Sequence, residues 1–293
     1  MVKFAPLNLT AEEIIQFTPE WSGERSADGR PRVSDDILLR MRSVTVTQAW
    51  SVMRREGYHW QYEGGWQCTQ PGKTLVGRAV TVSYLPRRED LRKHVFALAH
   101  ESGCVGDQVT WPIEPLVRGD VYVADIMGKI ADGAAIGDNL ATSILTKSGN
   151  GVVHDGSIRD IDGVKELTDF VGFCRGYHPS VATATVVLGG INCPIRIGGV
   201  TVMPGDVVLA REDGVVFIPP QFAEPVVLDA EATQLRDIFG KKSLAEGRFS
   251  PGEIDRKWDP YIEDAFLEWL AAPDRELPVP ASTIAGLLNG SLS

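Results

Sequence analysis

The sequence has few cysteines, no long apolar run and no excess of positive charge. Its four cysteines form no Cys-x-x-Cys pair and have no histidine at zinc-finger spacing, which favours reduced, mostly buried thiols. No stretch approaches the ~18 apolar residues that span a bilayer, and the N-terminus does not resemble a secretion signal. The net charge of -10 disfavours general binding to nucleic acid. We therefore expect a cytoplasmic protein that binds neither membranes nor nucleic acid.

The composition is that of a folded protein with a sizeable core. Hydrophobic residues make up 43% of the chain and charged residues 23%, which is typical of globular proteins. The length of 293 residues fits one large domain, or one domain that carries long arms. The acidic net charge does not exclude small anionic substrates, because the electric field at the binding site, and not the charge of the whole chain, decides whether they bind.

Periodicity and turn signals predict a helical arm before the core. Residues 1–70 are polar and rich in turn-forming residues. They contain two helix-start patterns, at Thr10 and Ser34, and a further helical pattern at 45–55. We expect this part of the chain to form an N-terminal arm of short helices.

The rest of the chain predicts an α/β core and a C-terminal arm. Residues 71–240 begin with β-branched residues in rough alternation at 75–85 and end with a helical pattern at 221–239. A Gly-Gly pair at 198–199 separates two alternating runs and predicts a hairpin. Residues 241–293 are rich in charge, Trp, Pro and Gly, which indicates an extended arm with one short helix.

The segment Gly137-Asp138-Asn139-Leu140 predicts a sharp turn that leads into a helix. Glycine lets the chain turn, and Asp or Asn can cap the helix that follows. The first amides of a helix are unpaired donors, and the helix dipole adds partial positive charge, so a carboxylate fits there. Two interpretations stay open, an ordinary helix cap and a site for a substrate carboxylate.

A second polar segment follows a short buried strand predicted at 151–156. Its residues emerge at the C-terminal end of that strand, where the sites of α/β proteins gather. Arg159 offers a planar fork for an oxyanion, and Asp160 offers a hard oxygen ligand suited to Mg²⁺. The alternative is a surface ion pair. His154, at the end of the strand, is either an acid/base group or a structural histidine.

Together the two segments indicate a metal-dependent enzyme that acts on a small α-keto acid. A helix N-terminus, an arginine and a metal-binding carboxylate would bind such a substrate. The metal would take the keto and carboxylate oxygens, and Arg159 would stabilise the enolate when a bond beyond the keto group breaks.

The stretch GDNLATSILTKSGNGVVHDGSIRDIDGVKEL, residues 137–167, resembles the signature of the RraA-like family, which includes 4-hydroxy-4-methyl-2-oxoglutarate aldolases. Residues 75–82, residues 119–125 and the later stretch IGGVTVMPGDVVLAREDGVVFIP look like other strands of this family. The resemblance covers about residues 70–240. It implies an α/β fold, a β/β/α sandwich of the swivelling phosphohistidine-domain type, here with N- and C-terminal arms. It also implies a homotrimer or homohexamer.

The activity that the resemblance implies is that of a class II pyruvate aldolase, which depends on Mg²⁺ or Mn²⁺ and also decarboxylates oxaloacetate. Asp160 matches the metal ligand of the family. Arg159 matches the arginine that binds the substrate and stabilises the enolate, and Asp138 matches an acidic residue that holds a metal-bound water.

The same resemblance implies where the substrate binds. Gly137 begins the binding turn, and the amides of Asn139 and Leu140 match those that receive the pyruvate carboxylate. An acidic residue from the C-terminal helix of a neighbouring subunit is expected to complete each site. Glu231 is our candidate for it.

Two other functions stay open. The family also contains a non-catalytic, protein-binding regulator of ribonuclease E, in which the position after the signature arginine does not hold Asp, whereas Asp160 stands there in this chain. The same metal chemistry would also serve a hydratase or decarboxylase of a related sugar acid. The long arms depart from the compact family pattern, and so does the segment 106–115, which is an insertion or a variant lid. These departures concern the identity of the substrate more than the type of reaction.

Overall fold

The structure is a computed structural model that describes residues 8–272 and 276–292, and it divides into two compact units. The first unit ends at Ala223 and the second begins at Glu224. The domain boundaries that the sequence suggested, after residues 70 and 240, stay a prediction. In the described part of the chain, no helix is both long and apolar enough to cross a membrane.

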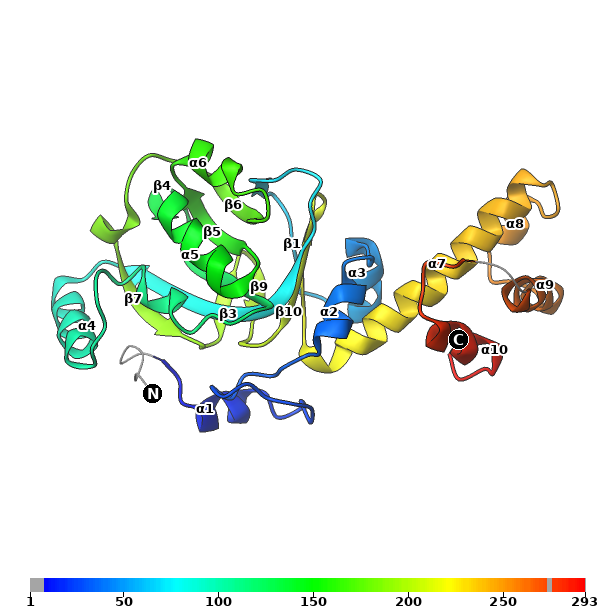
Figure 1. Ribbon diagram of the computed structural model, residues 1–293, viewed down its shortest axis with the longest axis horizontal. Coiled ribbons are helices and arrows are strands. Elements are labelled where there is room, and N and C mark those ends of the chain that lie inside the picture. Colours follow the sequence, from blue (N-terminus) through cyan, green and yellow to red (C-terminus); the bar gives the residue numbers. More distant parts are fainter. Residues whose placement is uncertain (1–7, 273–275, 293) are drawn as a thin grey trace. The chain divides into compact units, whose positions relative to one another are not determined.

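The first unit is an α/β structure built on a large mixed sheet (Figure 1). Its strands are β1 (Tyr62–Glu63), β2 (Gln67–Cys68), β3 (Leu75–Pro86), β4 (Asp120–Ile136), β5 (Val152–Ile158), β6 (Gly172–Tyr177), β7 (Val186–Ile191), β8 (Ile195–Ile197), β9 (Val200–Val202), β10 (Val207–Arg211) and β11 (Gly214–Ile218). Its helices are α1 (Ala11–Phe17), α2 (Asp35–Met41), α3 (Val46–Arg55), α4 (Glu89–Glu101), α5 (Asp138–Ser148) and α6 (Ile161–Glu166), with short 3-10 turns η1 (Trp111–Ile113), η2 (Ala182–Ala184) and η3 (Pro220–Phe222).

The order of strands in the sheet is β1-β11-β10-β3-β4-β5-β6-β2, with β7 paired to β3, while β8 and β9 form a separate hairpin. Strands β3, β4, β5 and β6 run parallel, and the flanking pairs are antiparallel. The carboxyl ends of β4 and β5 therefore lie at one edge of the sheet, next to each other. The α/β class predicted from the sequence is confirmed.

Alternating side chains of the central strands enter two different apolar cores. In β4, Tyr122 belongs to a core shared with α4 and α5, whereas Val123 belongs to a core shared with the β8–β9 hairpin and β10. Both side chains are fully buried. The sheet is thus covered on both faces, which explains why neighbouring residues of its parallel strands, such as these two, are both apolar.

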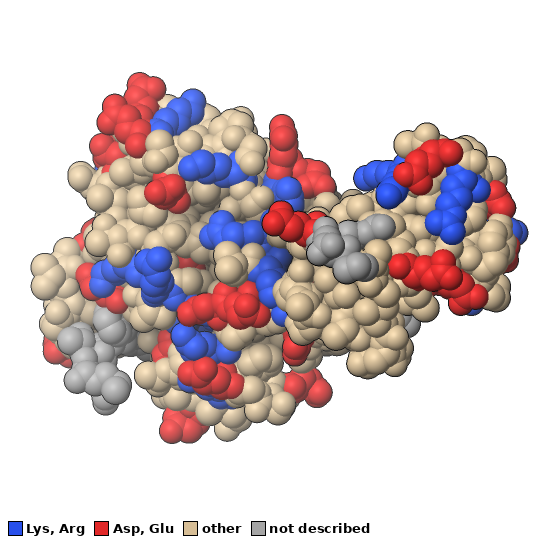
Figure 2. Space-filling model, turned by 45° about the vertical axis from the view of Figure 1, so that its right-hand side comes forward, with Lys and Arg blue, Asp and Glu red and all other residues tan. Residues whose placement is uncertain are grey.

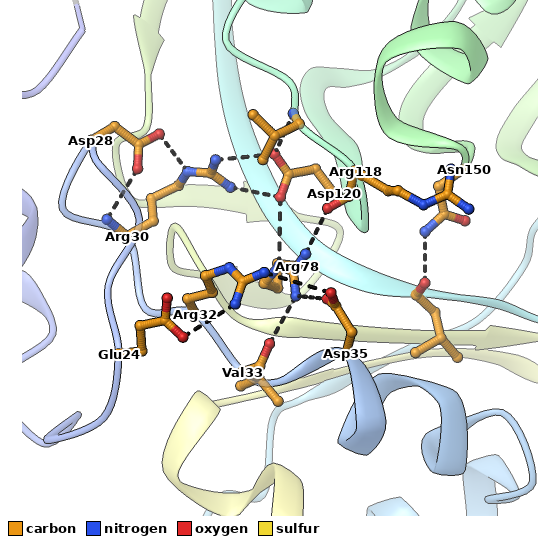
Figure 3. Close-up of polar contacts among 12 residues, drawn as sticks. Glu24, Asp28, Arg30, Arg32, Val33, Asp35, Arg78, Arg118, Asp120 and Asn150 are labelled. Carbon is orange, nitrogen blue, oxygen red and sulfur yellow. Dashed lines mark hydrogen bonds and ion pairs between the residues drawn. The ribbon is translucent and has the colours of Figure 1, made fainter.

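A buried ion-pair network joins the segment before α2 to the first residues of β3 and β4 (Figure 3). Arg30, which is 1% exposed, donates two hydrogen bonds to Asp120 at 3.2 and 3.0 Å. Arg78 donates to the carbonyl of Val33 and to Asp35, both at 2.8 Å. Burial alone would lower the pKa of Arg30, but Asp120 and Asp28 raise it above its usual value, so the guanidinium stays charged.

The second unit has its own apolar core, formed by the helices α7 (Ala223–Ala245), α8 (Pro251–Ile254), α9 (Pro260–Ala271) and α10 (Ala281–Leu288). Phe239 of α7 lies edge-on or tilted against Phe266 and Trp269 of α9, with ring centroids 5.6 Å apart in both pairs. Among the described residues after 241, α8, α9 and α10 follow the end of α7, where the sequence predicted an extended arm with one short helix at about 262–270, the place of α9. The aromatic residues of this segment recur at helical spacing and bury one another, which the high content of charge, Pro and Gly obscured.

Candidate functional site

The two polar segments that the sequence singled out lie together at the carboxyl edge of the parallel strands. Ile136, the last residue of β4, pairs with Ile158, the last residue of β5. The residues that follow these two, Gly137 and Arg159, are consequently neighbours. The main-chain N–H of Arg159 also donates a hydrogen bond to the carbonyl of Ile136, at 3.0 Å.

Because Gly137 has no side chain, the side chains of Arg159 and Asp160 can lie close to it. A Cβ placed on Gly137 would lie 2.4 Å from Asp160 Oδ2 and 3.1 Å from Arg159 Nε. Gly163 of α6 makes room for the carboxylate of Asp138 in the same way, because a Cβ on Gly163 would lie 3.0 Å from Asp138 Oδ2. The two carboxylates are thus each packed against a glycine at the junction of α5 and α6.

Asp160 and Arg159 form an ion pair, with Arg159 Nε 3.4 Å from Asp160 Oδ2. The side chain of Arg159 is 38% exposed and that of Asp160 is 45% exposed, so the pair adds little to stability and both groups remain accessible to a ligand. Asp160 has a left-handed backbone, with φ 53° and ψ 42°, immediately before α6. Aspartate tolerates this conformation better than most residues, and the turn directs the chain away from the sheet edge.

The first turn of α5 offers main-chain donors beside this pair. Gly137 is the residue that precedes the helix, and its position has no side-chain cap. The N–H of Asn139 donates to Asp138 Oδ1 at 2.8 Å, so a substrate carboxylate would share this donor with Asp138 or displace it. The helix dipole favours an anion at this end of the 11-residue helix.

The donor set fits a hard divalent cation that keeps most of its waters. Between residues 8 and 292, residues 273–275 left aside, no group of three His, Cys, Asp or Glu side chains could hold a metal by itself. Mg²⁺ needs only one or two protein carboxylates, and Asp160 and Asp138 are the accessible candidates at this edge. The space beside Gly137 and Gly163, which any side chain would fill, is where these carboxylates lie.

Two histidines lie near the site in different environments. His154 is completely buried within β5, and this burial lowers its pKa to about 4, so its ring is neutral at pH 7. Its Nε2 is 3.4 Å from the carbonyl of Gly133, an arrangement typical of a structural histidine. His178 follows β6, and its main-chain N–H donates to the carbonyl of Ile158 at 3.2 Å. His178 is half-buried at the same sheet edge as Arg159, a proximity that depends on strand pairing and that the sequence did not reveal.

Glu231 lies in the second unit, on α7. Its side chain is 6% exposed, and its Oε2 accepts a hydrogen bond from Thr283 Oγ1 of α10 at 2.5 Å. Its assignment to a neighbouring subunit's site stays a prediction. The assignments of Gly137, Asp138, Asn139, Leu140, Arg159 and Asp160 also stay predictions, although the structure brings these six residues together.

Comparison with known proteins places residues 31–217 in the family described as RraA-like, Aldolase/RraA. Protein DlpA of Legionella pneumophila is 29% identical over 188 residues, which cover 63% of this chain and 28% of that protein. A Halalkalibacterium halodurans protein, provisionally named 4-hydroxy-4-methyl-2-oxoglutarate aldolase, is 37% identical over 128 residues, which cover 44% of this chain and 60% of that protein. The chain thus spans less than two thirds of the length of either relative.

Solved structures lead to the same family. Streptomyces coelicolor RraAS2, described as an unusual member of the RNase ES inhibitor RraA protein family, aligns with a TM-score of 0.60 at 27% identity. The alignment covers 72% of this chain and 98% of that one. A Pseudomonas syringae protein at 24% identity shares the fold, with a TM-score of 0.61 over 77% of this chain and all of that one. Because the family match extends over more than half of its length, the chain belongs to the RraA-like family.

Proposed function

We propose that this protein is a Mg²⁺- or Mn²⁺-dependent lyase that cleaves a carbon–carbon bond of a 4-hydroxy-2-oxo acid and releases pyruvate. The observation that carries the proposal is the junction of α5 and α6, where Arg159, Asp160 and Asp138 lie beside the first amides of a helix. Relatives named as aldolases of such an acid support it. Oxaloacetate, which also yields pyruvate when it loses CO₂, is a second expected substrate.

Each residue has a defined task in this reaction. Asp160, with Asp138 acting through water, would hold the cation, which supplies Lewis-acid polarisation of the keto group when bound. The amides of Asn139 and Leu140 would bind the substrate carboxylate at the α5 N-terminus. These contacts would orient the bond between C3 and C4 relative to the guanidinium of Arg159.

Bond cleavage then requires one proton transfer and one charge to be stabilised. Asp138, directly or through water, would accept the proton of the C4 hydroxyl group. The C3–C4 bond breaks as the carbonyl of the departing product forms, and its electron pair passes to the pyruvate enolate. Arg159 would donate hydrogen bonds to the oxygen that gains charge, and C3 finally takes up a proton to give pyruvate.

The direct test is pyruvate release from a panel of 4-hydroxy-2-oxo acids and oxaloacetate, measured with and without EDTA and with Mg²⁺ or Mn²⁺ restored. We expect activity only with a divalent cation, and none in Asp160→Asn. Asp162→Asn is the matched control, because Asp162 is an exposed carboxylate two residues further along the same helix. Full turnover by protein freed of metal would refute the proposal.

Two further candidates remain as outcomes of this test. A protein-binding regulator is supported by the description of RraAS2, and it predicts no turnover on any substrate of the panel. A hydratase or decarboxylase of a related sugar acid predicts cation-dependent turnover without release of pyruvate from 4-hydroxy-2-oxo acids. We also propose that the protein is a cytoplasmic homo-oligomer, trimeric or hexameric, with Glu231 of one subunit completing the site of the next.

A further inference from the structure

A cavity lies in the first unit, apart from the residues at the junction of α5 and α6. It has a volume of about 250 Å³ and is lined by residues from four separate segments, within 17–21, 58–61, 201–206 and 219–221. None of its lining residues belongs to the candidate site described above. A ligand of this cavity would therefore be independent of the proposed lyase reaction.

A buried carboxylate lines this cavity. Asp206 is 2% exposed, and its Oδ2 accepts a hydrogen bond from the main-chain N–H of Met203 at 2.8 Å. No other side-chain hydrogen bond or ion pair of Asp206 exists within the described residues, so its Oδ1 keeps its full capacity as an acceptor. Because Asp206 lines the cavity, a ligand there can donate a charge-assisted hydrogen bond to this oxygen.

The other lining residues match a positively charged ligand. Phe17, Trp21 and Tyr58 contribute aromatic residues to the lining, and Glu20 contributes a second, exposed carboxylate. Among the described residues that line the cavity, none is Lys, Arg or His. Aromatic rings attract cations through their quadrupole, and a carboxylate adds a charge-assisted hydrogen bond.

Trp21, one of the aromatic residues that line the cavity, is held in place by hydrogen bonds of its own segment. The guanidinium of Arg25 donates to the hydroxyl group of Thr18 at 2.8 Å, to the carbonyl of Thr18 at 2.7 Å and to the carbonyl of Trp21 at 3.0 Å. The indole Nε1 of Trp21 donates to the carbonyl of Glu24 at 2.7 Å. A preformed wall lowers the entropy lost on binding.

We propose that this cavity binds a small organic cation with one ammonium or guanidinium group, which donates to Asp206 Oδ1 and contacts the rings of Trp21 and Tyr58. The volume of about 250 Å³ is below the range of drug-sized ligand sites and suits a compact metabolite. The site would give the protein a second ligand in addition to the keto acid of the lyase proposal.

The electrostatics of Asp206 give the site a characteristic pH dependence. Burial raises the pKa of Asp206 to about 7, and the other titratable groups that line the cavity are Glu20 and Tyr58. A cation binds the ionised carboxylate, so its affinity should rise as the pH increases through about 7 and fall below it. A neutral ligand of the same shape would show no such trend.

The test is isothermal titration calorimetry of the full chain with methylguanidinium and ethylammonium, against 1-propanol and propanoate as neutral and anionic probes. We expect the two cations to bind and the other probes not to bind. Asp206→Asn, whose amide oxygen can still accept from Met203, should weaken cation binding by about 10-fold or more, because a hydrogen bond to a charged group is lost. Trp21→Leu should weaken it by about threefold or more through loss of the ring face.

Controls separate this site from general attraction to an acidic protein. Glu12→Gln removes an exposed carboxylate that does not line the cavity and should change the affinity by less than about twofold. Unchanged thermal unfolding of Asp206→Asn would show that the variant is folded. Equal binding of 1-propanol, or of methylguanidinium to wild type and Asp206→Asn, would overturn the proposal. Tighter binding of a short lysine-containing peptide than of ethylammonium would overturn the assignment to a small molecule.

Discussion

The carboxylate of Asp160 lies in the space that a side chain at Gly137 would need, since a Cβ there would be 2.4 Å from Asp160 Oδ2. Gly137 has an extended backbone, with φ -122°, so alanine would cause no backbone strain and would act by displacing the Asp160 carboxylate and crowding Arg159. We expect Gly137→Ala to lower kcat/KM by about 10²-fold, as a shift of about 1 Å at a reacting centre can do.

The measurement for Gly137→Ala is pyruvate release at saturating Mg²⁺, together with the thermal unfolding midpoint. Gly252→Ala is the matched control, because no atom lies within 4 Å of a Cβ placed at Gly252. If Gly137→Ala retained wild-type kcat/KM, the position of Asp160 would have no importance for the reaction.

Arg159 should affect turnover far more than stability. Loss of a preorganised donor to a developing oxyanion costs about 10²–10³ in kcat, so Arg159→Ala should lose that much. Arg159→Lys should also be poor, because lysine lacks the planar fork that binds two oxygens. Steady-state kinetics are the measurement, and Arg88→Ala at an exposed arginine is the control. Near-normal kcat in Arg159→Ala on every active substrate would exclude the assigned role.

Much of the fold could be predicted where the signal is local. The Thr10 capping box begins α1, and the Gly-Gly pair at 198–199 joins β8 to β9, both as predicted. The two segments that meet at the junction of α5 and α6 could be singled out for the same reason, because a glycine turn before a helix marks the first and a short apolar strand precedes the second. Only the pairing of Ile136 with Ile158, which the sequence does not show, brings the two segments together.

Features that depend on distant residues could not be predicted. Strand β7 contains two glycines and is defined by its pairing with β3, about 100 residues earlier in the chain. The second half of β4 includes Met127 and Asp132 with positive φ, which disrupts any alternating pattern. The segment 106–115, read from the sequence as an insertion or a variant lid, contains the buried Trp111, and its role stays a prediction. The Asp206 cavity is built from four segments that lie far apart in the sequence.

Removal of one partner of the buried pair Arg30–Asp120 should destabilise the protein strongly. Arg30→Met would remove two hydrogen bonds from the carboxylate of Asp120, which is 1% exposed, and leave it only the main-chain N–H of Val117 and the more distant Arg78 Nε, at 3.8 Å. The loss should be about 3–5 kcal/mol in the free energy of unfolding, measured by urea denaturation. Adding Asp120→Asn should recover part of this loss, because the buried negative charge is removed. Equal stability of Arg30→Met and wild type would contradict the importance of the network.

Complementation between inactive variants tests whether each site is shared by two subunits. Asp160→Asn and Glu231→Gln should each be inactive alone, but subunits mixed after mild dissociation should regain roughly a quarter of wild-type activity if sites form between neighbours. Thr283→Val is the control, because it removes the hydrogen bond to Glu231 and leaves the carboxylate in place. Full activity of Glu231→Gln, or no recovery on mixing, would exclude Glu231 from the site.

The last prediction concerns two buried groups whose effects on stability oppose each other. Burial lowers the pKa of His154 to about 4, so the unfolded chain binds more protons between about pH 4 and 6.5, and stability is lost as the pH falls. Burial raises the pKa of Asp206 from 3.8 to about 7, so the folded chain binds more protons in that window, and stability is lost as the pH rises.

Removing either group should therefore uncover the effect of the other. Relative to wild type, Asp206→Asn should gain unfolding free energy as the pH rises from about 4 to 7, by up to about 1 kcal/mol per pH unit. His154→Gln should show the opposite change between about pH 4 and 6.5. Urea denaturation across this range measures both differences, and the remaining titrating groups cancel because the variants share them. Parallel pH profiles for wild type and Asp206→Asn would show that the Asp206 carboxyl group titrates alike in the folded and unfolded chain.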